Sequence, residues 1–366
     1  MRMKRINSTL QLAAMTIIVA IGSFAFGETI NVPKDAKTIQ AAINLAQGDD
    51  VIIVEAGRYH EIINFNGKSI TLKSKSGAAA TTIDGWKLGD SVVKCISGEG
   101  PSTVIDGFTI TGGTGNKDLY SSEETVGGGL LCIGSSPTVK SCIIVSNSSS
   151  YQGGGVFNGD RSNTTLVNCK IRSNVSERGG GLYNSRGAPE LRDTLVADNA
   201  ANYGGGGMYN FGSNIRVVSC TFRQNRAEYN GGGVYDYDSG GRMIATVFTD
   251  NLAMFNGNAV YRGYRSATLI EDDCKFTMIH DTIAGTGGYM VAQGKATGAC
   301  CIGTGCLIVD DKSCVKAGGL WLGPNTSCDD QLLICPKPST GDINTDGVVD
   351  MMDLVLVMTS MDDQIN

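Results

Sequence analysis

The sequence is poor in proline, with 7 residues in 366, and in charged side chains, which make up 18% of the chain. The shortage of proline excludes a collagen-like or proline-rich disordered chain. No basic stripe runs along the sequence, and the formal net charge is −6. Because nucleic-acid binding needs cations that face the phosphates, this balance argues against a nucleic-acid partner.

Long hydrophobic runs are also lacking, apart from one near the N-terminus. A basic start, MRMKR, precedes an apolar run at 12–26, and the small residues Ala25 and Gly27 stand where a signal-peptidase cut would follow. The run is shorter than the roughly 20 residues of a membrane-spanning helix. Residues 1–27 are therefore predicted to be a secretory signal peptide, with an uncleaved anchor as the alternative. We expect a secreted, extracellular or cell-surface protein without a membrane span after signal removal.

Glycine is the residue in excess, with 50 copies, and many of them belong to a repeat. A GGG block recurs every 26 residues, followed each time by an apolar residue and then usually by an aromatic one. A degenerate sixth copy starts at Gly257. The five complete blocks start at Gly127, Gly153, Gly179, Gly205 and Gly231.

A second signature lies five or six residues before the glycine blocks. An asparagine stands there, preceded by Ile, Val or Phe at three residues and by Cys or Thr at five, so these two positions share one strand face. Short strands and turns in a 26-residue unit predict the coils of a parallel β-solenoid, stacked about 4.8 Å apart. The asparagines, expected to bond one another from coil to coil, are Asn147, Asn174, Asn199, Asn225 and Asn251.

One amphipathic helix is predicted at Thr38–Gln47, before the first coil, where it would cover exposed strand edges. Residues 32–74 resemble the N-terminal capping segment and first coils of the pectin-lyase-like superfamily. The paired signature, as in FRQN with GGGM, is similar to the repeats of polymorphic outer-membrane proteins. The resemblance covers roughly residues 28–298 and implies an all-β, right-handed parallel β-helix.

Enzymes of this superfamily mostly cleave acidic polysaccharides, so the resemblance implies a polysaccharide lyase or a glycoside hydrolase as one function. Neither of the two histidines lies in the Gly-His-Gly of polygalacturonase-like hydrolases, and the residue set of a pectin methylesterase is not identifiable. A shift of 26 residues places Asp160 beside Arg186 and Asp236 beside Arg262, either as lyase-like groups or as surface ion pairs of small energy. The catalytic residues are left unassigned.

Glycan binding is the function that the glycine block itself favours. Stacked blocks would form a side-chain-free strip about 10 Å wide, with aromatic ridges beside it on which sugar rings stack. The alternative is that the glycines fill a bend where no Cβ fits and that the aromatic rings stabilise one another. Glu177 replaces the aromatic residue in one coil. The candidate groove residues are Tyr151, Phe157, Tyr183, Tyr203, Tyr209, Tyr229, Tyr235 and Tyr261.

Six of the 12 cysteines crowd into a short segment near the C-terminus. An even number in a small exported segment predicts a framework of three disulfides, and the absence of a CxxC pair argues against zinc. Cys142 and Cys169, which share a column in adjacent coils, are either a further disulfide or small buried residues. The segment resembles a cysteine-rich module of secreted bacterial proteins, and its cysteines are Cys300, Cys301, Cys306, Cys314, Cys328 and Cys335.

The acidic tail carries a calcium-loop pattern. Oxygen-bearing side chains occupy positions 1, 3, 5, 9 and 12 of the loop, with Gly347 at the sharp turn and a carbonyl at position 7. The loop resembles one type I dockerin repeat, which implies calcium as a cofactor and a cohesin-like or cell-surface partner. Dockerins carry two repeats, so pairing with another chain or stabilisation of the tail are alternatives. The predicted ligands are Asp342, Asn344, Asp346, Val348, Asp350 and Asp353.

The sequence therefore predicts four parts: a signal peptide at 1–27, a parallel β-helix at 28–298, a cysteine-rich module at 299–336, and a linker with a dockerin-like repeat at 337–366. Non-catalytic binding of a glycan or surface partner is the favoured function. A polysaccharide-degrading enzyme and a structural or passenger protein are the alternatives.

Overall fold

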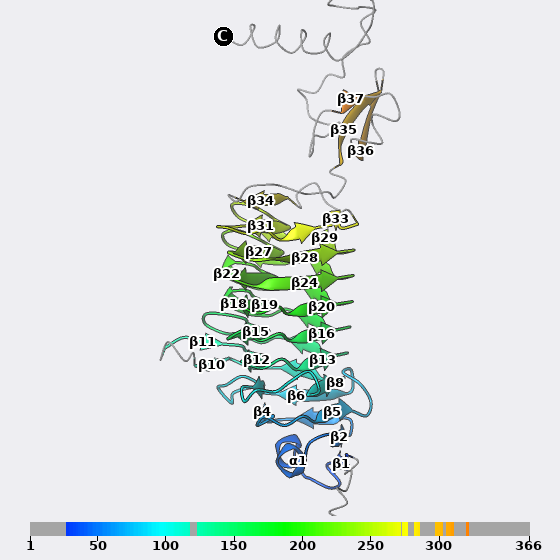
Figure 1. The fold of residues 1–366 in the computed structure, drawn as a ribbon, viewed down its shortest axis with the longest axis vertical. Helices are drawn as coiled ribbons and strands as arrows, with labels where there is room; N and C mark the ends of the chain where they lie inside the picture. Colours follow the sequence, from blue (N-terminus) through cyan, green and yellow to red (C-terminus); the bar gives the residue numbers. More distant parts are fainter. Residues whose placement is uncertain are drawn as a thin grey trace, which may run out of the picture.

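The computed structural model describes residues 27–117, 123–271, 273–276, 282–285, 297–302, 305–310 and 320–321. Short strands wind into a parallel β-solenoid of about 9 turns (Figure 1). Three long sheets and one shorter sheet run along its axis, and strands from successive turns lie side by side within each. The predicted all-β parallel solenoid is confirmed.

Each sheet collects equivalent strands of successive coils. In spatial order, sheet A contains β1 (Thr29–Val32), β2 (Val51–Val54), β5 (Thr71–Ser74), β8 (Val104–Asp106), β13 (Thr138–Lys140), β16 (Thr165–Val167), β20 (Glu190–Arg192), β24 (Asn214–Val218), β28 (Gly240–Ile244) and β32 (Leu269–Ile270). Sheet B contains β3 (Gly57–Tyr59), β6 (Thr81–Asp84), β9 (Thr109–Thr111), β14 (Ile143–Val145), β17 (Lys170–Arg172), β21 (Leu195–Ala197), β25 (Thr221–Arg223), β29 (Val247–Thr249) and β33 (Lys275–Phe276).

The other two sheets border the candidate site. Sheet C contains β4 (Ile63–Asn64), β7 (Val93–Cys95), β12 (Leu130–Ile133), β15 (Val156–Gly159), β19 (Leu182–Ser185), β23 (Met208–Phe211), β27 (Val234–Tyr237), β31 (Val260–Arg262) and β34 (Ile283–Gly285). Sheet D contains β18 (Val175–Arg178), β22 (Ala200–Gly204), β26 (Arg226–Ala227) and β30 (Leu252–Ala253).

The register of sheet C follows the 26-residue period. Val156 pairs with Leu182, Leu182 with Met208, and Met208 with Val234, and all four side chains are fully buried. Because side chains alternate between the two faces of a strand, the next residue of each strand points outward. One contiguous apolar core therefore fills the solenoid, and the outward residues form columns along its surface.

Helix α1 (Ile39–Leu45) lies at the N-terminal end of the solenoid (Figure 1). Thr38 caps it by accepting a hydrogen bond from the Ala41 amide, at 3.1 Å. The Glu61 carboxylate accepts the Ile39 and Gln40 amides, both at 2.9 Å, so the first turn keeps few unpaired donors. The helix buries Ile39, Ala42 and Ile43 against the core.

The predicted asparagine column is confirmed as a ladder inside the solenoid. The side-chain amide of Asn174 donates to Oδ1 of Asn199 at 3.0 Å, and that oxygen also accepts the backbone amide of Asn174 at 3.0 Å. The same pair of bonds joins each asparagine to the next from Asn147 to Asn251. Each buried amide is thereby satisfied by its neighbour one coil away.

The glycine blocks lie beneath the surface, so the predicted side-chain-free surface strip is wrong. Gly179 has φ +66°, a conformation that favours glycine. A Cβ on Gly180 would lie 2.2 Å from the carbonyl oxygen of Ala200, and one on Gly181 would lie 2.5 Å from that of Gly207. The glycines are buried because stacked coils leave no room for a Cβ, as the alternative interpretation proposed.

Three features lie beside the solenoid coils or beyond them. An antiparallel arm, β10 (Asn116–Lys117) and β11 (Thr125–Val126), branches from one coil (Figure 1). Strands β35 (Thr297–Ile302), β36 (Gly305–Asp310) and β37 (Leu320–Trp321) form an antiparallel sheet. Residues 1–26 of the predicted signal peptide, the calcium loop and the remaining cysteine-rich segment lie outside the described residues.

Two further predictions concern cysteines and membranes. Cys142 and Cys169 are buried free thiols, so the structure does not contain the disulfide suggested for them. Burial raises the pKa of Cys142 to about 12, which keeps that thiol protonated and unreactive. Within the described ranges, no helix has the length and apolar character needed to cross a membrane.

Candidate functional site

An outward column of sheet C forms the floor of a groove. Phe157, Tyr183, Tyr209, Tyr235 and Tyr261 are partners in register along β15, β19, β23, β27 and β31. Ring centroids of the first four lie 5.6, 5.3 and 4.6 Å apart, and the interplanar angles do not exceed 14°. These four side chains are at most 9% exposed. The face of each ring is therefore covered by the rings of the neighbouring coils, and this stacking stabilises the coils against one another.

The first wall of the groove is a stack that includes a cation. Tyr203, Tyr229 and Phe255 stack with centroid distances of 5.4 and 4.7 Å. The Arg178 guanidinium lies between Tyr151 and Tyr203, 5.0 Å from each ring. Arg178 is in register with Gln152 and Gly204, one residue after the aromatic position of each coil, so its long side chain reaches back to the two rings. Glu177 does replace the aromatic residue in the chain, opposite a register shift in β22, but the group that fills the space between the two rings belongs to the next residue, Arg178.

The second wall varies in height along the axis. Phe211 and Tyr237 stack at 5.6 Å, and the Arg186 guanidinium lies 5.5 Å from the Phe211 ring. In the two preceding coils the equivalent positions are Ser185 and Gly159, which are small. This loss of side-chain volume leaves a recess between the two walls.

The recess is a cavity of about 510 Å³. Five of the eight predicted groove residues line this cavity, whereas Tyr229, Tyr235 and Tyr261 do not. Sequence reasoning missed Arg178, and it named Asp160 and Arg186 as neighbours without placing them in the groove. The cavity is lined by Val126, Ile133, Tyr151, Gln152, Phe157, Gly159, Asp160, Arg178, Tyr183, Ser185, Arg186, Tyr203, Tyr209, Phe211 and Tyr237.

Arg178 is held in the wall with donor capacity to spare. Its Nη1 donates to the Tyr151 hydroxyl at 2.9 Å, and its Nη2 lies 3.6 Å from Glu177 Oε1. Its Nε is buried and has no hydrogen-bond partner. Desolvation opposes the charge of Arg178, but attraction to Tyr151, Tyr209 and Glu177 raises its pKa above the ordinary value. The guanidinium is therefore a fixed cation beside the cavity.

Tyrosine phenols complete the polar character of the groove. Burial, followed by the proximity of Tyr183, raises the pKa of Tyr209 above that of a free phenol. Its hydroxyl therefore stays protonated at neutral pH and is able to donate. A fixed guanidinium, neutral phenols and ring edges form a surface that suits a ligand with hydroxyl groups and negative charge.

The Asp236 and Arg262 pair is interior, so its interpretation as a surface ion pair is wrong. Asp236 is 0% exposed and Arg262 is 5% exposed, and the two are partners in register. Asp236 Oδ1 accepts the Asn210 amide at 2.7 Å, at the end of a second column of inward amides that starts at Asn158. The 26-residue spacing of Asn158, Asn184, Asn210 and Asp236 was the sequence signal for this column.

The remaining titratable candidates do not assemble a recognisable catalytic centre. Asp160 and Arg186 both line the cavity, but none of the ion pairs found joins them. His60 is exposed, with Nδ1 3.7 Å from Asp84 Oδ2. His280 lies outside the described residues. Within the described part of the chain, no group of three or more His, Cys, Asp or Glu side chains is placed to hold a metal ion.

Comparison with known proteins gives a likeness of fold at low identity. No family model matches the chain, and no curated protein matches it. A pectin methylesterase from Aspergillus niger is 13% identical over 74% of this chain and 88% of its own, with a TM-score of 0.40. The pectin methylesterase from Yersinia enterocolitica is also 13% identical, over 67% of this chain and 95% of its own, with a TM-score of 0.40.

A polygalacturonase from Erwinia carotovora is 11% identical over 70% of this chain and 96% of its own, with a TM-score of 0.34. At such identities and TM-scores, however, neither an activity nor a set of site residues transfers to this chain.

Proposed function

We propose that the protein binds an acidic polysaccharide along the groove between sheets C and D and does not itself cleave it. The observation that carries this proposal is the position of Arg178 in the cavity wall, between two tyrosines and with a buried, unpartnered Nε. A guanidinium that lines a cavity suits a carboxylate or sulfate group.

The remaining lining groups suit the sugar part of such a ligand. Tyr151, Tyr203, Phe211 and Tyr237 are half-buried in the two walls, so part of each ring stays accessible. Aromatic side chains offer an apolar body to the C–H faces of a sugar ring and, in tyrosine, a polar tip to its hydroxyls. Because the columns repeat once per coil, neighbouring units of a polymer meet similar surroundings.

Tyr203→Ala is expected to weaken binding of an acidic polysaccharide at least tenfold, which corresponds to about 1.4 kcal/mol. The substitution removes a cavity wall and one of the two rings that hold Arg178. Phe255→Ala is the matched control, since it truncates the same stack at a 63% exposed residue that does not line the cavity. Titration calorimetry with polygalacturonate, alginate and hyaluronate measures both variants. Equal affinities of both variants and the wild type for every polymer that binds would contradict the proposal.

An acidic-polysaccharide lyase or hydrolase is the second candidate, favoured by one observation. The Asp160 carboxylate lines the same cavity as Arg178 and Arg186, so a carboxylate and two cations face one ligand site. Such groups are able to serve as acid and base when their pKa values are suitably shifted. Release of unsaturated or newly reducing ends from the bound polymer would select this candidate.

We also propose that the C-terminal loop binds calcium and docks to a cohesin-like or cell-surface partner. The support is the oxygen-ligand spacing from Asp342 to Asp353. In the full chain, Asp346→Ala is expected to abolish one calcium-binding event in calorimetry and to leave the unfolding temperature of the solenoid unchanged. An unaltered calcium stoichiometry in this variant would rule out the loop as the site.

A further inference from the structure

The β10–β11 arm lies at one end of the groove. Val126, the last residue of β11, lines the cavity and pairs through an isolated bridge with Gln152 in the next coil. Val126 and Leu131 are each 1% exposed and belong to the same apolar cluster as Phe157. The floor column is therefore covered at Leu131, one coil beyond Phe157, by apolar packing at the base of the arm.

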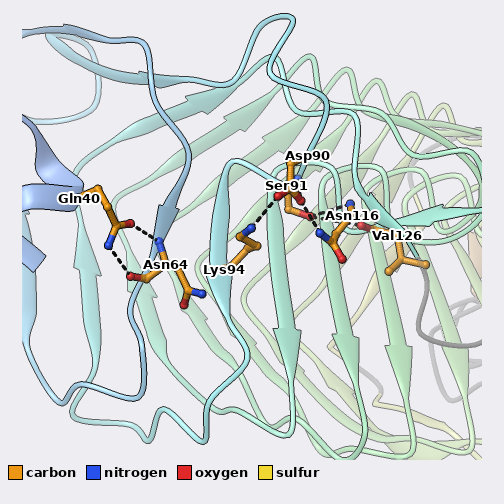
Figure 2. Close-up of polar contacts among 7 residues, drawn as sticks. All are labelled: Gln40, Asn64, Asp90, Ser91, Lys94, Asn116 and Val126. Carbon is orange, nitrogen blue, oxygen red and sulfur yellow. Dashed lines mark hydrogen bonds and ion pairs between the residues drawn. The ribbon is translucent and has the colours of Figure 1, made fainter. Parts of the chain in front are cut away.

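The groove surface also changes its chemistry at this point. The floor column continues in register from Phe157 to Leu131, then to Lys94 and Asn64. No aromatic residue occupies the last three of these positions, so the aromatic surface ends where the arm begins. Figure 2 shows Lys94 directed toward Asp90, with Nζ 2.6 Å from Oδ2. This ion pair compensates the positive charge of Lys94.

Asp90 anchors the base of the arm to the coil (Figure 2). Its Oδ1 accepts the Asn116 side-chain amide at 2.6 Å and the Ser91 backbone amide at 2.7 Å. Ser91 Oγ accepts the backbone amide of Asn116 at 3.0 Å and donates to the Val126 carbonyl at 3.3 Å. The cluster thereby holds both strands of the arm.

The Asp90 carboxylate is charged when it makes these contacts. Partial burial would raise its pKa, but the hydrogen bonds from Lys94, Asn116 and Ser91 outweigh that effect and hold the pKa below the ordinary value. Charge-assisted bonds of this kind are about twice as strong as neutral ones. The anchor is therefore stable at neutral pH, and replacement of Asp90 removes three bonds together.

We propose that the β10–β11 arm closes this end of the groove, so that the groove accepts the terminus of a polysaccharide chain and excludes its interior, with Asp90 as the positioning residue of the arm. The aromatic column ends at the covered floor position Leu131, and the Asp90 anchor lies on the adjacent coil, beside Lys94. This inference rests on the proposed binding of an acidic polysaccharide.

The test compares chains of different length in the same panel: polygalacturonate, alginate and hyaluronate, each as short oligosaccharides and as long polymer. Calorimetry gives the number of protein molecules bound per chain at saturation. End binding predicts one protein per chain at every length, with equal affinity per chain end. A number that grows with chain length would overturn end binding and leave the proposed function intact. Absence of binding to every polymer would overturn the proposed function, and the inference with it.

Asp90→Ala tests the anchor. In this variant the number of proteins bound per long chain is expected to rise several-fold, while binding to short oligosaccharides is retained. Asp106→Ala is the matched control, because it also separates an aspartate from a lysine, Lys140 at 3.5 Å, but on sheet A. Asn116→Ala, which removes only one of the three bonds to Asp90, provides a second variant if Asp90→Ala does not fold. Retention of one protein per long chain in both variants would exclude Asp90 as a positioning residue.

Discussion

Gly206→Ala is expected to destabilise the solenoid by more than about 4 kcal/mol, a loss that few single substitutions reach. A Cβ at this position would lie 2.4 Å from the carbonyl oxygen of Arg226 and 2.6 Å from that of Gly232. Both obstacles are backbone atoms of the next coil, held by the inter-coil hydrogen bonds, so neither is able to rotate away. The free energy of unfolding, measured in urea by circular dichroism, tests the expectation.

The matched control for this substitution is Gly100→Ala. A Cβ at Gly100 meets no atom within 4 Å, and the backbone there is not in the left-handed region. We expect its unfolding free energy to stay within about 0.5 kcal/mol of the wild type. Similar stabilities of the two variants would show that the glycine blocks are not required by coil packing.

The second large effect is expected at the buried Asp236 and Arg262 pair. Arg262→Met removes the only cation that acts on Asp236 among its described neighbours, and leaves the fully buried carboxylate with the neutral Asn210 amide as its donor. Breaking a buried ion pair in direct contact costs about 3–5 kcal/mol, and since no ion pair joins these two side chains directly, we expect this as the upper limit. In an Asp236→Asn background the same change should cost far less or stabilise the protein, because an amide continues the Asn210 bond without charge. A double-mutant cycle of unfolding free energies measures this coupling.

The cost of Arg262→Met should also depend on pH. Burial already raises the pKa of Asp236 above 3.8, and loss of the nearby cation raises it further. A carboxyl with a raised folded-state pKa is destabilising when ionised, and protonation relieves that penalty as the pH falls. The cost should therefore be largest near neutral pH and shrink toward about pH 4. A cost that is independent of pH would contradict a charge interaction between the two residues. So would a double-mutant cycle in which the changes in unfolding free energy of the two single variants simply add.

The sequence repeat predicted the coil architecture well because stacking imposes the same requirement on every coil. Asn174 and Asn199 recur in phase since each amide needs its neighbour as partner. The glycines recur because the next coil excludes a Cβ at every block. The alternative in which Tyr183 and Tyr209 stack on one another is also what the structure contains. Periodicity thus identified which residues stack.

Periodicity did not reveal which side of the backbone each column faces. In the run from Gly205 to Asn210 the glycines are buried, Tyr209 faces the groove and Asn210 points into the core. A turn of unknown geometry precedes this run, so the sequence does not fix the inward and outward faces. Arg178 was missed for a related reason, because it occupies the position of Gln152 and Gly204 in the repeat, and the repeat does not show that its side chain reaches back to the aromatic rings.

The claim at the centre of this account is that the groove binds an acidic polysaccharide through Arg178 without cleaving it. The most direct test incubates wild-type protein and Arg178→Met with the three acidic polymers, with calcium present, and measures bound polymer and released ends in the same samples. The account predicts that the wild type binds at least one polymer and releases no new ends, and that Arg178→Met loses most of this binding while remaining folded. Release of new chain ends by the wild type, or undiminished binding by Arg178→Met, would contradict it.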